Sequence, residues 1–238
     1  KIATVKAFTH YLLIEDVIDI NPFDKIEVSF KEPVILPRTI PLNIINSILI
    51  CAYNLQSQTK TKYQKKITTR DIAVLEILFA TGARVSEICN LKLSSVDLTN
   101  HTVKIFGKGS KERMIQIENT DVLRALNNYY ELFQPDIKEC GFFFINKLHH
   151  RLSEQSVREI ICKYTAMTGY DIHITPHMFR HSFATLLLDE DVDIRYIQKL
   201  LGHSSITTTQ IYTHVAMAKQ KEILSVKHPR NKIIVNAK

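Results

Sequence analysis

Six side chains spread along this sequence are of the types that transfer a phosphoryl group. In chain order they are Arg84, Lys108, His177, Arg180, His203 and Tyr212. Two planar guanidinium groups can meet, bidentately, the negative charge that builds on the oxygens of a phosphodiester under attack. A tyrosine becomes a good nucleophile once its proton is taken, and an alkoxide leaves readily once it receives a proton. One proton-transferring group near each of those two oxygens would supply both transfers without a metal ion.

Each motif has an ordinary structural explanation when it is considered alone. Arg84 with Glu87 in TGARVSE is typical of a surface ion pair between residues three apart on a helix. Lys108, between two glycines in GKGSKER, belongs to a basic hairpin tip of a kind that is usually just solvated. A single histidine is most often an ordinary core or surface residue, but His177 precedes Arg180 by three residues in TPHMFRH, so the two side chains can lie on one helix face and converge on one anion.

Three histidines raise a rival interpretation, a metal site. His173, His177 and His181 are spaced four residues apart, as ligands on one face of a helix would be. No H-E-x-x-H motif or carboxylate ligand accompanies them, and His173 is expected to precede the helix that begins near Thr175. We therefore expect no metal site.

The order and spacing of the motifs favour a shared function. Lys108 follows Arg84 by 24 residues, and Tyr212 follows His203 by nine. The chain resembles the tyrosine recombinase or phage integrase family, in its Xer-type and integron or transposon integrase branch, through T-G-x-R-x-S-E, G-K-G-x-K-E-R, H-x-F-R-H-x-F-A-T and L-G-H-x-S-x-x-T-T-x-x-Y-T-H. The resemblance covers residues 41–214. It extends more weakly to the N-terminal helix, which is similar to the last helix of the family's core-binding domain.

The resemblance implies a role for each residue of the set. Arg84 and Arg180 would hold the two non-bridging oxygens of the scissile phosphate. Lys108 would donate a proton to the departing 5′ oxygen. His177 would act as general acid and base toward the nucleophile, Tyr212.

Other residues would support this pocket or contact DNA. His203 would hydrogen-bond the phosphate, and Glu87 would hold the arginines in place. Lys111, Arg113 and His181 are expected to contact the DNA. The function implied is site-specific recombination, with cleavage and rejoining of DNA strands through a 3′-phosphotyrosine in integration, excision or resolution.

The resemblance also implies the partners of such an enzyme. These are a double-stranded recombination site, three further copies of the chain in a tetramer on synapsed DNA with a Holliday junction intermediate, and accessory proteins. No cofactor, metal or ATP is expected. Three alternatives remain open: a basic DNA-binding regulator, a type IB topoisomerase with a similar pocket, and a metal-dependent nuclease.

Composition agrees with a globular DNA-binding protein. The chain has 238 residues, is 45% apolar and 23% charged, and carries a formal net charge of +7, which favours a polyanionic partner. Its four cysteines are scattered without a C-x-x-C pair, so neither a disulfide framework nor a zinc site is indicated. With no signal peptide pattern and no segment of about 20 apolar residues, we expect a cytoplasmic protein without membrane contact.

The helix and strand patterns in the segments around these residues predict a mainly α fold with a small antiparallel β-sheet (α+β). We place the end of a helical core-binding domain at 1–30, a proline-punctuated linker at 31–41, a catalytic domain at 42–214 and a basic tail at 215–238. Helices are predicted over 2–18, 42–55, 69–81, 153–168, 176–189 and 194–201, with two more helical runs in 206–226. Strands are predicted at 102–107 and 113–117, joined as a hairpin, and at 141–145.

Overall fold

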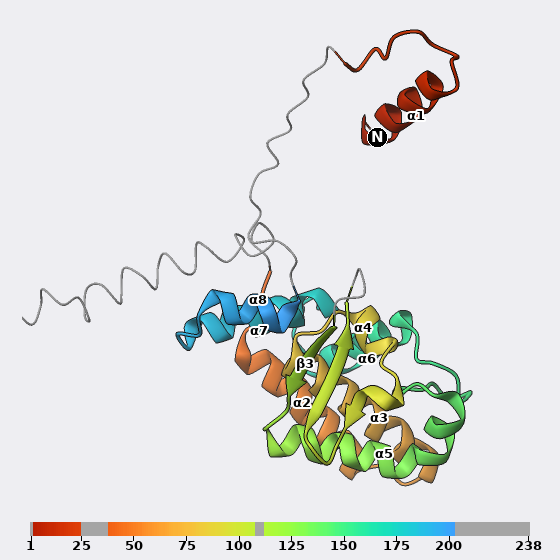
Figure 1. The fold of residues 1–238 in the computed structure, drawn as a ribbon. Coiled ribbons are helices and arrows are strands. Elements are labelled where there is room, and N and C mark those ends of the chain that lie inside the picture. The colour runs from red at the N-terminus through yellow and green to blue at the C-terminus, as the bar shows by residue number, and fades with distance from the viewer. Residues whose placement is uncertain (1, 25–37, 108–111, 203–238) are drawn as a thin grey trace, which may run out of the picture. The chain divides into compact units, whose positions relative to one another are not determined.

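A computed structural model describes residues 2–24, 38–107 and 112–202 of the chain (Figure 1). It separates two compact units, Lys1–Ile35 and Leu36–Lys238. The first unit contains α1 (Ile2–Ile14), four residues shorter than predicted. The helix ends early because Asp16 adopts a left-handed φ of 53° and the Val17 N–H bonds back to the Leu12 carbonyl at 2.9 Å, the pattern of a Schellman cap.

The second unit is built around one helix, α3 (Lys62–Thr81), which packs against α2 (Leu42–Ser57), α5 (Thr120–Cys140), α6 (Glu154–Met167) and α7 (Pro176–Asp189). The apolar side chains of 72–78 are buried on every face of α3, which is typical of a helix enclosed by others. The other helices are α4 (Val85–Cys89) and α8 (Ile194–Leu201), with a 3₁₀ turn at Leu93–Ser95. α5 was not predicted from the sequence. It begins at an Asn119 side-chain cap and carries Pro135 inside it.

The start of α3 differs from the prediction by two turns. The sequence places the first residues near Thr69, but the helix begins at Lys62, where the Thr61 hydroxyl accepts a hydrogen bond from the Gln64 N–H. Thr69 and Thr68 are not caps, because their hydroxyls donate to carbonyls one turn back within the helix.

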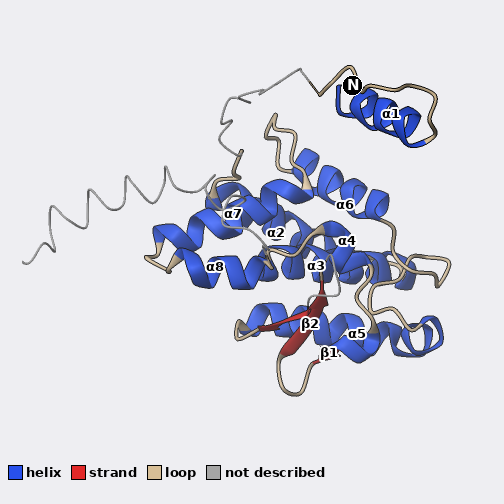
Figure 2. Cartoon of the chain, turned by 45° about the horizontal axis from the view of Figure 1, so that its top comes forward, coloured by secondary structure: helices blue, strands red, loops and turns tan. Residues whose placement is uncertain are grey.

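The small sheet is antiparallel, in the order β1 (Val96–Asp97), β2 (Thr102–Phe106) and β3 (Glu112–Gln116). Figure 2 shows it in red beside the helices that make up most of the unit. The predicted hairpin is therefore confirmed, together with the mainly α fold.

The predicted strand at 141–145 is wrong. Its residues form only isolated bridges at Phe142 and Ile145. The Tyr129 hydroxyl donates to the Phe143 carbonyl and accepts from the Ile145 N–H, so these two backbone groups bond to a side chain and not to a neighbouring strand.

Two helices that flank the motifs agree closely with the sequence. α7 begins at Pro176 and ends at Asp189, and α8 ends at Gly202, whose φ is +66°. Thr175 precedes α7 as predicted, but its side chain makes no capping bond. The two helical runs predicted in 206–226 lie outside the described residues. Within the described ranges, no helix is both long and apolar enough to cross a membrane.

Candidate functional site

Arg84 follows a sharp change of direction at the end of α3. Gly82 adopts a left-handed φ of +56°, and a Cβ there would lie 2.5 Å from the Phe183 ring. Only glycine satisfies both conditions without strain. The backbone of Arg84 is extended, and the short helix α4 begins at Val85 immediately after it.

Glu87, on α4, is the centre of a hydrogen-bonded cluster. Its Oε2 accepts the Arg84 backbone N–H at 2.8 Å and its Oε1 accepts Arg84 Nη1 at 2.9 Å. Arg113, on β3, donates Nη1 to Oε1 at 3.0 Å and Nη2 to Oε2 at 2.7 Å. Burial raises the pKa of the Glu87 carboxyl, but the bonds from Arg113 and Arg84 outweigh it and hold that pKa below its usual range.

A hollow of about 380 Å³ opens beside Arg84. Its lining residues are Arg84, Ser86, Glu87, Asn90, Phe106 and Gly107. The Arg84 side chain is 35% exposed, whereas Glu87 is 5% exposed. Glu87 therefore fixes one side of the Arg84 guanidinium while part of it still faces solvent, which is the arrangement an anion requires.

Arg180, on α7, is buried and connects two chain segments. It is 4% exposed. Its Nη1 donates to the Gly82 carbonyl at 2.8 Å and its Nη2 to the Leu201 carbonyl at 2.7 Å. One guanidinium thus holds the turn that precedes Arg84 and the last turn of α8, two residues before His203.

The histidines of α7 occupy different environments. His177 is exposed in the first turn of α7, and His181 is half-buried one turn further. Burial, together with the charges of His177 and Arg180, lowers the pKa of His181 below its ordinary value of 6.5. His173 precedes α7, as expected. Among the residues that the structure describes, no three or more His, Cys, Asp or Glu side chains form a group that could hold a metal ion.

Four residues of the predicted set lie outside the described residues, namely Lys108, Lys111, His203 and Tyr212. The structure places the residues next to them. Gly107 lines the hollow beside Arg84. Gly202 lies against Arg113, because a Cβ on this glycine would be 2.9 Å from Arg113 Nη1. Gly107 and Gly202, the described residues that directly precede Lys108 and His203 in the sequence, therefore both lie close to the cluster around Glu87.

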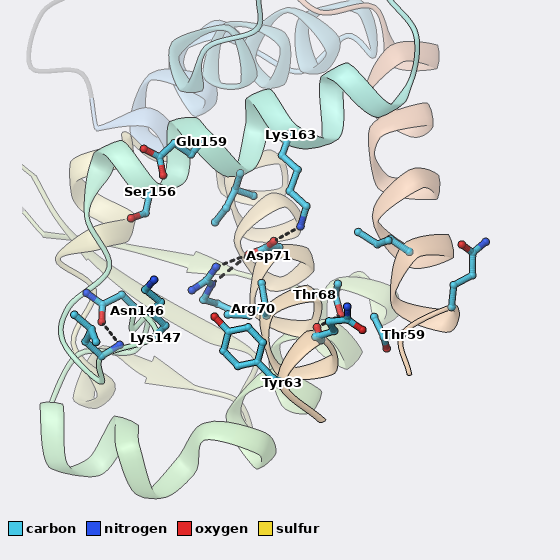
Figure 3. Close-up of a pocket in the computed structure, with 16 residues that line it drawn as sticks. Thr59, Tyr63, Thr68, Arg70, Asp71, Asn146, Lys147, Ser156, Glu159 and Lys163 are labelled. Carbon is cyan, nitrogen blue, oxygen red and sulfur yellow. Dashed lines mark hydrogen bonds and ion pairs between the residues drawn. The ribbon is translucent and has the colours of Figure 1, made fainter. Parts of the chain in front are cut away.

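A larger hollow, of about 840 Å³, lies around the N-terminal half of α3 (Figure 3). Its main feature is Asp71, whose Oδ1 accepts Arg70 Nη2 at 2.7 Å and whose Oδ2 accepts Lys163 Nζ and the Tyr164 hydroxyl, each at 3.1 Å. Of the residues proposed from the motifs, none that the structure describes lines this hollow. Sequence reasoning did not find this cluster, since Asp71 and Lys163 are 92 residues apart.

Comparisons with known proteins were made with the whole chain. Residues 53–219 match the phage integrase family. A tyrosine recombinase of Agathobacter rectalis is 56% identical over 230 residues, which cover 97% of this chain and 75% of the relative. The crystal structure of XerA recombinase aligns with a TM-score of 0.67 at 25% identity, over 94% of this chain and 82% of that one. A lambda integrase tetramer bound to a Holliday junction has a similar fold, with a TM-score of 0.60 at 17% identity, over 85% of this chain and 57% of that one.

Proposed function

This chain belongs to the phage integrase family and is a site-specific DNA recombinase, and from that premise we propose which of its residues cleave and rejoin the strands. Tyr212 attacks the scissile phosphate and forms a 3′-phosphotyrosine. A free 5′ hydroxyl later attacks that bond and displaces the tyrosine. Because the phosphotyrosine stores the energy of the broken bond, the cycle runs without ATP.

The observation that carries this proposal is the position of Arg84. Its guanidinium is anchored to a buried carboxylate on one side and partly exposed beside the 380 Å³ hollow on the other. A phosphate in that hollow would meet a preorganised cation, which stabilises charge that develops on a non-bridging oxygen. Because Glu87 already holds Arg84 in this orientation, less conformational entropy is lost when a phosphate binds.

Arg180 meets the second non-bridging oxygen in this proposal. A guanidinium has five N–H donors in a rigid plane, so the bonds of Arg180 to the Gly82 and Leu201 carbonyls fix its plane. These bonds also set the spacing between the segment that leads to Arg84 and the one that leads to His203.

Proton transfer is assigned to the remaining residues of the motifs. Lys108, between Gly107 and Gly109, protonates the departing 5′ oxygen, and His177 takes the proton of Tyr212. His203 hydrogen-bonds the phosphate. Two arginines and these proton carriers meet the needs of the reaction, so we propose that it is independent of metal ions.

The substrate is a double-stranded recombination site, and the acting form is a homo-tetramer on two synapsed sites. Strand exchange between two duplexes needs two active sites per duplex, and the similar lambda integrase was solved as a tetramer on a Holliday junction. Lys111 and His181 contact the DNA, the segment 215–238 packs on a neighbouring copy or on DNA, and accessory proteins assist. Residues 1–30 belong to a helical core-binding domain, and the protein acts in the cytoplasm, where bacterial DNA lies.

Covalent capture tests the assignment of the nucleophile. The protein is incubated with a nicked suicide duplex of its site, from which the cleaved end diffuses away, and the product is run on a denaturing gel. We expect the wild-type chain to form a stable protein–DNA adduct. Tyr212→Phe lacks the attacking oxygen, so it should form no adduct while binding the duplex with similar affinity.

A matched control uses the same substitution elsewhere. Tyr196, on α8, is 64% exposed, and Tyr196→Phe should form the adduct at the wild-type rate. An adduct formed by Tyr212→Phe would refute the assignment. Loss of the wild-type adduct in the presence of a chelator would refute metal independence.

A further inference from the structure

Arg113 is the most completely enclosed cation of the Glu87 cluster. Its side chain is 9% exposed, compared with 35% for Arg84. Both of its terminal nitrogens donate to Glu87, one to each carboxylate oxygen. This bidentate geometry fixes the rotation of both side chains as well as their distance.

The ion pair of Arg113 with Glu87 connects several chain segments, because Arg113 is part of the β-hairpin. Arg113 lies on β3, where it pairs with Ile105 of β2, so it belongs to the hairpin that carries Lys108. Its guanidinium also lies against Gly202, the residue before His203, and α8 packs against β3. One side chain therefore touches the three segments that lead to Lys108, Arg84 and His203.

The sequence suggested that Arg113 contacts DNA, but its surroundings argue for a different role. Both terminal nitrogens of Arg113 donate to one buried carboxylate, which neutralises the charge that a phosphate would need. The terminal nitrogens of Arg180, by contrast, donate to neutral backbone carbonyls. The Nε of Arg113 is also buried, and it has no hydrogen-bond partner among the residues that the structure describes. The side chain is thus directed into the protein.

We propose that Arg113 is a positioning residue, which holds β3 and Gly202 against Glu87. Through β3 and Gly202 it sets the position of Lys108 and His203 relative to Arg84. This inference rests on the proposed roles of Lys108 and Arg84. If the Arg113–Glu87 ion pair is removed, the hairpin keeps its strands but loses its fixed distance from the scissile phosphate. Proton donation by Lys108 then suffers first, because a displacement of about 1 Å in a reacting group can cost on the order of a hundredfold in rate.

Single-turnover cleavage distinguishes this role from a DNA contact and from general stability. The full chain and its Arg113→Met variant are compared on a normal duplex and on one whose bridging 5′ oxygen is replaced by sulfur, which leaves without being protonated. We expect Arg113→Met to cleave the normal duplex about tenfold to a hundredfold more slowly at saturating DNA. The sulfur substrate should recover at least about tenfold of that loss.

Salt dependence of binding separates the alternatives further. A lost phosphate contact would reduce the slope of log affinity against log salt by about 0.9. We expect Arg113→Met to retain the wild-type slope. A reduced slope with unchanged cleavage at saturation, or equal losses on both substrates, would overturn the positioning role.

Two further variants control for folding and charge. Arg113→Lys keeps the positive charge but loses the planar fork, so it should be nearly as slow as Arg113→Met, and full activity would overturn the proposal. Arg124→Met, which removes a 65% exposed arginine from a surface pair with Asp121, should cleave both substrates normally. Lys108→Ala is tested alongside. If sulfur fails to rescue Lys108→Ala, the proposed role of Lys108 as proton donor is wrong. If sulfur rescues Lys108→Ala but Arg113→Met cleaves the normal duplex at the wild-type rate, only the positioning role of Arg113 is rejected.

Discussion

Glu87, on α4, and Asp71, in the middle of α3, are both buried carboxylates with two cationic neighbours. Their side chains are 5% and 2% exposed. The cations around Asp71 are Arg70, its neighbour in sequence, and Lys163 on α6, and the Tyr164 hydroxyl completes the cluster. This cluster joins α3 to α6, and within the described ranges none of its printed bonds goes to a residue of the motifs.

The cluster around Glu87 differs in what it connects. Its arginines come from the start of α4 and from β3, and one of them, Arg84, remains partly exposed beside a hollow. The hollow next to Asp71 is the larger of the two, so size does not identify the functional site. What distinguishes Glu87 is that its partners belong to segments that carry the side chains proposed to react, while the partners of Asp71 join two helices.

The largest effect that this comparison predicts is on stability, at Asp71. Asp71→Ala leaves Arg70, Lys163 and the Tyr164 hydroxyl without their shared acceptor, and we expect a loss of about 3 kcal/mol in the free energy of unfolding. The measurement is denaturant unfolding at pH 7. Under conditions where the variant is folded, its single-turnover cleavage should stay within about twofold of wild type. A specific loss of cleavage in folded Asp71→Ala would place this cluster in the active site. The Asp71 and Glu87 clusters would then no longer differ in function.

At Glu87 the same kind of change should act on the chemistry. Glu87→Gln keeps the size of the side chain but removes the charge that holds Arg84 and Arg113 together, so both arginines can move. We expect cleavage at saturating DNA to fall on the order of a hundredfold, or about 2.7 kcal/mol of transition-state stabilisation. The check is a double-mutant cycle with Arg113→Met, in which the two losses should combine to much less than their product. Fully multiplicative losses would mean that the two residues act separately.

The sequence predicted the elements that carry local signals. Gly82 and Gly202 mark the ends of α3 and α8, and Pro176 marks the start of α7, because helix ends depend on backbone rules that act within one or two turns. The hairpin was predicted for the same reason. The helix end at Ile14 was missed since the left-handed residue there is an aspartate, Asp16, and no glycine signals it.

Contacts between distant segments were not predictable from the chain alone. The pairing of Arg113 with Glu87 spans 26 residues and that of Arg180 with Leu201 spans 21. Motif reasoning assigned Arg113 to DNA because an exposed arginine and a buried one have the same letter in the sequence. Only the packed structure shows which acceptors surround each guanidinium, and the bonds of Arg113 to Glu87 are what support the positioning role proposed for it.

The smallest predicted effect concerns pH, and it compares Glu87 with a buried carboxyl, that of Glu76, which has no ion pair with any residue that the structure describes. Glu76, on α3, accepts the Tyr53 hydroxyl at 2.8 Å. Burial raises the pKa of Glu76 above its ordinary value of 4.5, although the Tyr53 bond acts against it, whereas the pKa of Glu87 is held below 4.5. A lowered carboxyl pKa contributes stability that is present above 4.5 and is lost as the pH falls toward the folded-state value. A raised one contributes stability that is present below 4.5 and is lost as the pH rises through the folded-state value.

The two carboxyls should therefore give opposite pH slopes. The free energy of unfolding is measured by denaturant titration from about pH 3 to pH 7, a range that includes the window below 4.5 in which Glu87 takes up its proton, for wild type, Glu87→Gln and Glu76→Gln. The difference between wild type and Glu87→Gln should shrink as the pH falls below 4.5, since protonation of Glu87 weakens its bonds to the arginines. The difference between wild type and Glu76→Gln should change in the other direction, becoming less favourable to wild type as the pH rises. Slopes of the same sign would show that the arginines do not control Glu87, and the contrast on which its role in the active site depends would be lost.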